Sequence, residues 1–133
     1  MKQVIALAAA ALLPAAQALG CEPALRGADV RLLEGERYVV AWRAPARLPL
    51  AEFFSFDFAV CARDHDPVYA VRVDAAMPEH SHGMNYRPSI TAFGDGRFRA
   101  GGLLLHMPGR WVLAISVGAA GHRETLRDAL SVD

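Results

Sequence analysis

The chain has 133 residues, a length typical of one domain. Its 14 Lys and Arg residues balance 14 Asp and Glu residues, so no basic excess favours nucleic-acid binding. Two cysteines and a short apolar N-terminal run point instead toward a small exported protein.

Residues 1–18 have the features of a secretory signal peptide. Lys2 precedes an apolar run over residues 4–13, and Ala16-Gln17-Ala18 forms a small-residue cleavage motif. We expect a helix here that contributes nothing to the mature core. Residues 19–133 are expected to form one domain without a membrane span, located in the bacterial periplasm or outside the cell.

The two cysteines, Cys21 and Cys61, both fall in the predicted mature chain. In an oxidising compartment an even pair predicts a disulfide. A second interpretation makes Cys21 the acylated N-terminus of a lipoprotein. Lipoprotein signals usually have leucine three residues before the cysteine, whereas this chain has Ala18, so the disulfide is preferred.

From residue 25 onward, period-two alternation of apolar residues predicts an all-β domain. Residues 29–33 and 38–43 are expected to be strands joined by a turn at residues 34–36. Residues 44–50 contain Pro45 and Pro49, which lack the amide hydrogen that a strand interior needs, and this segment is expected to be a connector.

The next strand is expected to be strongly aromatic on one face. Phe54, Phe56, Phe58 and Val60 alternate with small or polar residues, so their face should be buried. Cys61 has the opposite parity, which predicts a disulfide on the other face or at the strand end. In the following strand, residues 69–77, every second residue is expected to be buried, and the last of these is Met77.

The C-terminal half continues the same pattern, with strands of similar spacing and strong turn signals between them. Such spacing favours an immunoglobulin-like β-sandwich of about seven to eight strands. Gly101-Gly102 suggests a bulge within one of these strands. The expected elements are strands at residues 89–93, 97–105, 111–117 and 123–132, a tight hairpin turn at 94–96 and a turn at 118–121.

Residues 77–88 form the longest segment without a strand pattern, and they concentrate histidine and methionine. His80, His82 and Met84 are spaced by two, so an extended backbone would project all three side chains to one side. A second segment, residues 105–111, supplies His106 and Met107. If the two segments meet, imidazoles and thioethers would form a soft-to-intermediate donor set suited to copper.

Each of these residues also has a structural interpretation. Met77 fits the core, and the histidines can hydrogen-bond loop backbone. The concentration of all mature methionines in the two segments favours metal binding over that alternative. The predicted copper ligands are His80, His82, Met84, His106 and Met107, with Met77 as a further candidate.

The two motifs resemble a known family. Residues 77–88 (MPEHSHGMNYRP), 94–99 (GDGRFR) and 105–111 (LHMPGRW) are similar to the YtkA-like family of small secreted β-sandwich proteins, related in pattern to FixH proteins. The likeness spans about residues 54–117. It implies an immunoglobulin-like fold, an extracytoplasmic location and an association with copper handling, without a defined reaction. FixH-type proteins carry a membrane anchor, whereas the signal predicted here is cleaved.

The sequence therefore predicts a secreted, non-enzymatic protein that holds copper or delivers it to an envelope partner. The alternative is an interaction module in which residues 77–88, with Tyr86 and Arg87, dock an envelope partner without metal. Nucleophile elbows, phosphate loops and cysteine-histidine zinc spacings are absent from the sequence, so a hydrolytic enzyme is not expected.

Overall fold

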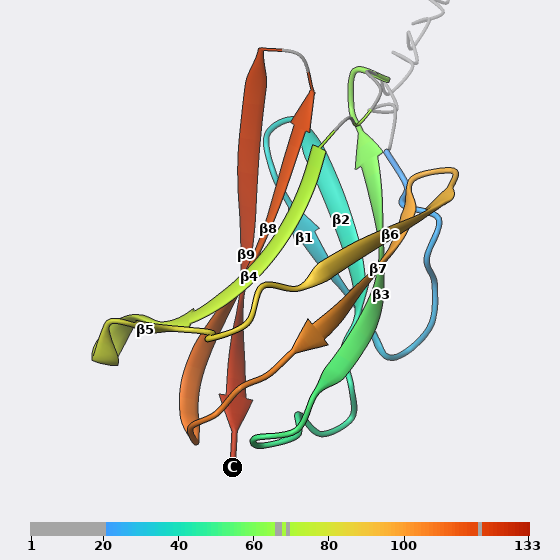
Figure 1. Ribbon diagram of the computed structural model, residues 1–133. Coiled ribbons are helices and arrows are strands. Elements are labelled where there is room, and N and C mark those ends of the chain that lie inside the picture. The colour runs from blue at the N-terminus through green and yellow to red at the C-terminus, as the bar shows by residue number, and fades with distance from the viewer. Residues whose placement is uncertain (1–20, 66–67, 69, 120) are drawn as a thin grey trace, which may run out of the picture.

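The computed structural model describes residues 21–65, 68, 70–119 and 121–133, which form two packed β-sheets (Figure 1). The signal peptide predicted at residues 1–18 lies outside the described residues. Within this part of the chain, no helix is long and apolar enough to cross a membrane. The elements are β1 (Val30–Glu34), β2 (Tyr38–Arg43), β3 (Phe54–Ala62), β4 (Ala70–Met77), the 3-10 helix η1 (Pro78–His80), β5 (His82–Gly83), β6 (Ser89–Gly94), β7 (Arg97–Leu103), β8 (Gly109–Ala119) and β9 (His122–Val132).

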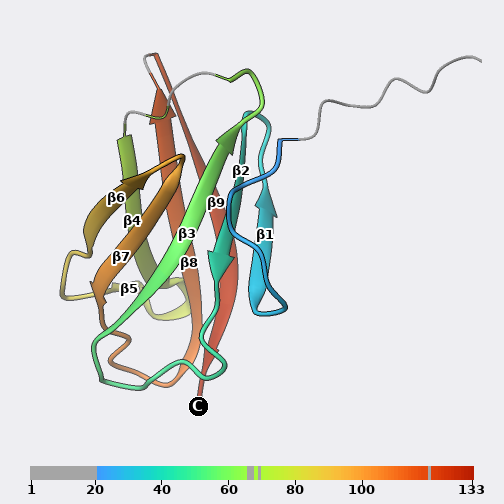
Figure 2. The same cartoon turned by 90° about the vertical axis from the view of Figure 1, so that its right-hand side faces the viewer.

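The strand order is that of an immunoglobulin-like sandwich. One sheet has the order β1-β2-β3-β7-β6 and the other β5-β4-β8-β9, with antiparallel pairing between the named strands. Without β1, the order β2-β3-β7-β6 corresponds to strands A, B, E and D of the immunoglobulin fold. The order β5-β4-β8-β9 corresponds to its strands C′, C, F and G. Figures 1 and 2 show the two sheets as separate layers. The predicted fold class is confirmed, with β5 as a strand that the sequence did not predict.

The core lies between the two sheets and is built by the predicted alternation. Phe56, Phe58 and Val60 of β3 face inward, and Trp42 and Trp111 are almost completely buried. Removing a large apolar side chain from water contributes about 1.5–3 kcal/mol. These side chains are therefore a principal source of the sandwich's stability.

The predicted irregularity at Gly101-Gly102 is present as a β-bulge. Phe54 pairs with Leu103, whereas Ser55 pairs with Gly101, so Gly102 is the extra residue. Gly102 has a φ of +77°, a conformation that suits glycine. The bulge bends β7 just before the chain leaves the sheet toward His106.

The disulfide joins Cys21 to Cys61 across a sequence separation of 40 residues. Cys61 pairs with Val39 near the end of β3, and it has the opposite parity to the buried Phe58 and Val60. Both the pairing and its predicted position outside the core are therefore confirmed. The bridge fastens the N-terminal segment to the outer face of the five-stranded sheet.

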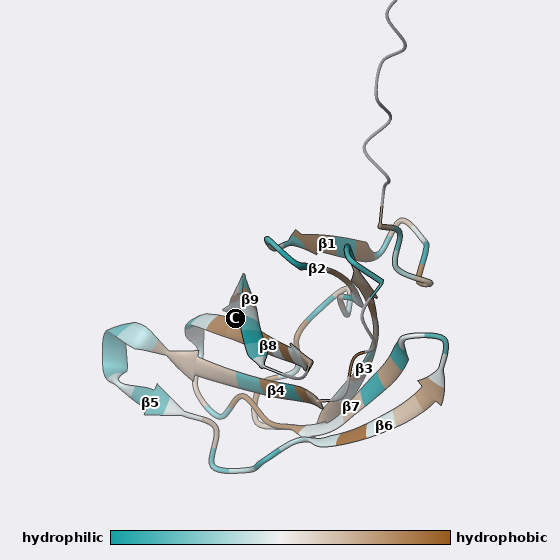
Figure 3. Ribbon diagram, turned by 90° about the horizontal axis from the view of Figure 1, so that it is seen from above, coloured by the Kyte–Doolittle hydropathy of each residue, from teal (hydrophilic) through white to brown (hydrophobic). Residues whose placement is uncertain are grey.

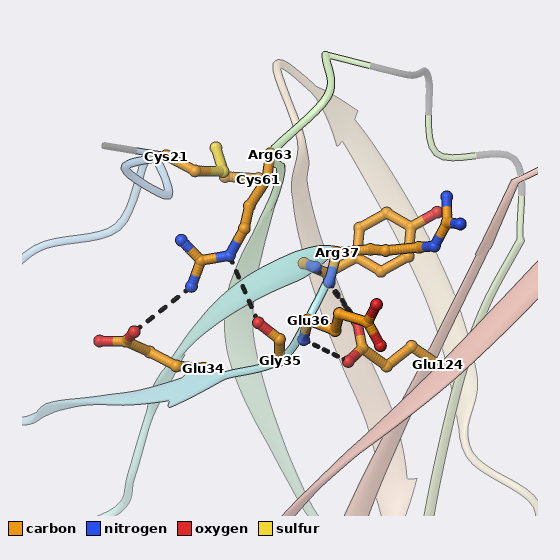
Figure 4. Close-up of polar contacts among 9 residues, drawn as sticks. Cys21, Glu34, Gly35, Glu36, Arg37, Cys61, Arg63 and Glu124 are labelled. Atoms are coloured by element: carbon orange, nitrogen blue, oxygen red, sulfur yellow. Dashed lines mark hydrogen bonds and ion pairs between the residues drawn. A yellow bond between two sulfur atoms is a disulfide. The ribbon is translucent and has the colours of Figure 1, made fainter. Parts of the chain in front are cut away.

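The turn between β1 and β2 holds a carboxylate from the other sheet. The Glu124 carboxylate accepts hydrogen bonds from the backbone N–H groups of Glu36, Arg37 and Tyr38, at 2.6, 3.1 and 3.1 Å (Figure 4). Gly35 lies against the same carboxylate, whose Cδ is 2.6 Å from the position that a Cβ would occupy. Successive backbone amides of this kind form an anion-binding concavity. Here the bound anion belongs to the chain itself and ties β9 to the β1–β2 turn.

The segment predicted as one long loop is more ordered than expected. After Met77 the chain forms η1, turns at Ser81 and pairs back on β4 as β5, so the first half of residues 77–88 is a short hairpin. Figure 3 shows this hairpin extending beyond the edge of the sandwich with a mainly hydrophilic surface. Residues 84–88 then cross to β6 in the other sheet.

Candidate metal centre

The register of the β4–β5 hairpin places His82 beside the buried Met77. Met77 pairs with His82 and Ala76 with Gly83, and the Met84 N–H donates to the Ala75 carbonyl at 3.2 Å. Side chains of directly paired residues lie on the same face of a sheet. His82 and Met84 therefore share the inward face of Met77 and Ala75, at the open edge of the sheet.

His80 does not follow the predicted extended spacing. It is the last residue of η1, and Ser81 after it has a φ of +54°, in the left-handed region. The expected extended backbone is thus wrong at His80, whereas His82 and Met84 lie on one face of the β4–β5 pair. A proline at the start of η1 and the Ser81 N–H bond to the Pro78 carbonyl, at 3.3 Å, form the turn.

The second segment is fixed by backbone bonds on both sides of His106. Leu105 is completely buried and forms a parallel bridge with Leu50, and its carbonyl accepts the Ala51 N–H at 2.8 Å. Further along, the Trp111 indole N–H donates to the Met107 carbonyl at 2.9 Å. These bonds fold residues 105–111 into a turn at the edge of the core.

The two segments meet through their histidine rings. The His82 and His106 ring centroids are 6.3 Å apart with an interplanar angle of 86°, and His106 packs on the Trp111 ring at 5.5 Å and 80°. The His80 ring also lies beside that of His82, with centroids 6.5 Å apart. Successive ring contacts thus connect three predicted ligands in a row, His80 to His82 to His106, and then the buried indole of Trp111.

One atom of this row is buried without a partner. Among the described residues, His106 Nδ1 has no hydrogen-bond partner, and because it is buried, bulk water cannot take that place. A buried polar atom left unpaired costs about 1–3 kcal/mol, so most are paired in folded proteins. An unpaired imidazole nitrogen is a candidate metal donor.

The three methionines of the two segments lie at different depths. Met77 is 1 % exposed, and its Cε lies 3.0 Å from the position that a Cβ on Gly109 would occupy. Its thioether therefore reaches from β4 to the turn that carries His106. Met84 and Met107 are half-buried and pack against the core cluster from the two segments.

The donor set that these residues offer is mixed. No three His, Cys, Asp or Glu side chains gather as a metal-binding group in the described part of the chain. The His82–His106 spacing nevertheless fits a shared ion. A metal bonded to one nitrogen of each ring at about 2.0 Å holds the two centroids about 5 Å apart at a tetrahedral angle and about 6.3 Å apart in a linear arrangement. With thioethers carried by the same two segments, the donor chemistry suits Cu(I) better than harder ions.

Sequence reasoning identified Tyr86 as a docking residue but missed its aromatic partner, Phe53. Phe53 and Tyr86 are 60 % and 51 % exposed, and their ring centroids are 5.0 Å apart. Phe53 follows the segment that bridges to Leu105, and Tyr86 follows Met84 by two residues. The pair joins two loops far apart in sequence, and Phe53 carries no local pattern that would have indicated it.

Comparison with known proteins supports the fold alone. No protein-family profile and no curated protein matches the sequence. A solved structure of a DUF4426 family protein from Pseudomonas aeruginosa is similar, with a TM-score of 0.53 and 12 % sequence identity over 78 % of this chain and 94 % of that chain. The resemblance of the two motifs to the YtkA-like family stays a prediction.

Proposed function

We propose that the protein is a non-enzymatic copper carrier of the periplasm or cell exterior, which holds Cu(I) or delivers it to an envelope partner. The observation that carries the proposal is the approach of His82 to His106, whose buried Nδ1 lacks a partner. The Cys21–Cys61 disulfide supports an oxidising compartment.

The ligands in this proposal are two imidazoles from separate segments and thioethers around them. Neutral nitrogen and thioether donors do not compensate a high charge, and thioether ligands select Cu(I). Zinc sites draw on thiolates, histidines and carboxylates, and both cysteines of this chain are joined in the disulfide. The Trp111 ring against His106 would cover the inner side of a bound ion.

The test is a Cu(I) titration of the purified mature protein under anaerobic conditions, in competition with a chromophoric chelator. We expect one equivalent to bind, and His82→Ala and His106→Ala each to weaken binding at least tenfold. His65→Asn is the matched control, since it removes an exposed histidine elsewhere and asparagine tolerates its φ of +59°. A wild-type protein that holds no copper against a moderate chelator would overturn the proposal.

A second candidate function is docking of an envelope partner without metal. The exposed Phe53–Tyr86 pair favours it, because exposed aromatic side chains are enriched at protein interfaces. Arg87 is exposed beside Tyr86. On this alternative, Tyr86→Ala abolishes co-purification of a defined partner, while the double change His80→Ala and His82→Ala leaves both the partner and the metal content unchanged.

A further inference from the structure

We infer that His80 is a loading ligand: it receives Cu(I) at the surface together with His82, and the ion then passes to the inner pair of His82 and His106. This inference rests on the proposed copper function and gives the three histidines different roles. His82 is shared by both pairs, and only the inner pair holds the ion at rest.

The first support is the gradient of exposure along the row. His80 and His82 are exposed, His106 is half-buried, and Trp111 behind it is completely buried. Figure 3 shows the connection between β4 and β5 extending beyond the sandwich, and His80 in this connection is exposed. The row therefore runs from solvent to the edge of the core.

The second support is the spacing of the rings. The inner pair has a centroid separation of 6.3 Å, which one ion bridges in a linear arrangement. The outer pair, at 6.5 Å, reaches the same separation after a ring shift of about 0.2 Å. His80 makes its ring contact with His82, whereas His106 contacts His82 and Trp111. The ion thus has two neighbouring positions that share one ligand.

The third support is the difference between the two ends of the row. His106 presents a buried nitrogen that lacks a partner, so binding an ion there removes an existing cost. His80, exposed to water, gains no such relief. The Met77 methyl group also lies against Gly109, in the turn that carries His106. The binding free energy therefore favours transfer of the ion from the outer pair, His80 and His82, to the inner pair, His82 and His106.

The transfer step is a ligand exchange without electron transfer. The bond from His106 Nδ1 to the ion forms while the His82 bond persists, and the His80 bond then breaks. Copper stays Cu(I), and His80 leaves as a neutral imidazole. His106 must carry its proton on Nε2, so that Nδ1 has a free lone pair.

The experiment separates loading rate from equilibrium affinity. Cu(I) is delivered anaerobically from a weak small-molecule complex to the mature protein in a Trp42→Phe background, so that quenching of the remaining Trp111 fluorescence reports arrival at His106. Dissociation constants are measured separately by chelator competition. For His80→Gln we expect loading to slow at least tenfold while the Kd changes less than threefold. Glu79→Gln, on the same exposed turn, is the control and should load at the wild-type rate.

The possible outcomes are distinct. If His80→Gln weakens the Kd tenfold or more, His80 is a permanent ligand, and the inference fails while the copper function stands. An unchanged loading rate also overturns the inference. If the wild-type protein binds no Cu(I), the proposed function fails and the inference with it. Circular dichroism of each variant verifies that the sandwich is intact.

Discussion

His82 and His106 approach each other with ring centroids 6.3 Å apart, although one belongs to β5 and the other follows β7. β5 and β7 lie in different sheets, so the contact closes the open edge between the layers. The neighbours on the inner side are apolar, namely the buried Met77 and Trp111. The two imidazoles therefore form the polar boundary of the hydrophobic core.

Replacing His106 by phenylalanine should stabilise the metal-free protein. The substitution keeps a planar ring against Trp111 and removes the buried, unpaired Nδ1. Since an unpaired buried polar atom costs about 1–3 kcal/mol, we expect the free energy of unfolding to rise by about 1 kcal/mol after the cost of fitting a larger ring. Urea unfolding of the apo protein measures the change.

His82→Phe is the comparison for this prediction, because His82 is exposed and its replacement removes no buried polar atom. Its unfolding free energy should stay within about 0.5 kcal/mol of the wild type. A His106→Phe protein that is less stable than the wild type by 1 kcal/mol or more would show that His106 supports the fold, against the interpretation of Nδ1 as a metal-binding atom.

The Glu124 carboxylate should stabilise the fold through the turn it occupies. It accepts three backbone N–H groups of the β1–β2 turn, from residues 36–38, and hydrogen bonds to charged groups are stronger than neutral ones. We expect Glu124→Ala to lower the free energy of unfolding by about 1–3 kcal/mol, and Glu124→Gln by less, since one carbonyl acceptor remains. Thermal and urea unfolding provide the values.

The control for Glu124 is Glu52→Ala, which removes an exposed acid from a connector. Surface changes of this kind usually alter stability by less than about 0.5 kcal/mol. Equal effects of the two substitutions would mean that the three amides are satisfied as well by water as by Glu124.

The fold was predictable because its signals are local and repeated. Alternation of Phe54, Phe56 and Phe58 fixed the buried face of β3, and the opposite parity of Cys61 predicted the position of the disulfide. Turn chemistry at residues 94–96 and the glycines at 101 and 102 identified a hairpin and a bulge correctly. Each of these features depends on a few adjacent residues.

The candidate site was less predictable because it depends on distant contacts. A strand of two residues, His82–Gly83, has no periodicity to detect, and Ser81 adopts a positive φ that is unusual for serine. The extended spacing assigned to His80 was wrong for this reason. The approach of His106 to His82 requires the pairing of β4 with β5 and the bridge between Leu50 and Leu105, neither of which leaves a local pattern.

The Asp57–Arg99 ion pair should make a small, pH-dependent contribution. Two hydrogen bonds, of 2.7 and 3.2 Å, from the Arg99 guanidinium hold the pKa of the Asp57 carboxyl below its usual 3.8. A depressed folded-state pKa stabilises the protein above the unfolded-state pKa, and this stability is lost as the pH falls through the folded-state value. Both side chains are more than one-third exposed, so Asp57→Asn should cost only about 0.2–1 kcal/mol at pH 7.

The difference between wild type and Asp57→Asn should shrink as the pH is lowered from about 5 to about 2, because the wild-type carboxylate then also loses its charge. Urea midpoints measured across this range test the sign. A difference that grows toward low pH would contradict the assignment of the ion pair. High salt at pH 7 should reduce the difference as well, since both groups face solvent.

Gly109 should be the most sensitive glycine of the candidate site. Its φ is +122°, which side-chain-bearing residues rarely adopt, and a Cβ there would meet the Met77 Cε at 3.0 Å. We expect Gly109→Ala to lower the free energy of unfolding by about 1–3 kcal/mol, because the backbone strain persists even if the methionine moves. Gly101→Ala is the matched control: its φ is not in that region, and the nearest atom to its Cβ, Ser89 Oγ, is at an ordinary 3.5 Å.

Adding Met77→Ala to the Gly109→Ala variant separates the two causes, backbone strain at Gly109 and collision with the Met77 side chain. If the collision dominates, Gly109→Ala should cost much less in the Met77→Ala background, whereas equal costs in both backgrounds would assign the effect to the backbone at Gly109.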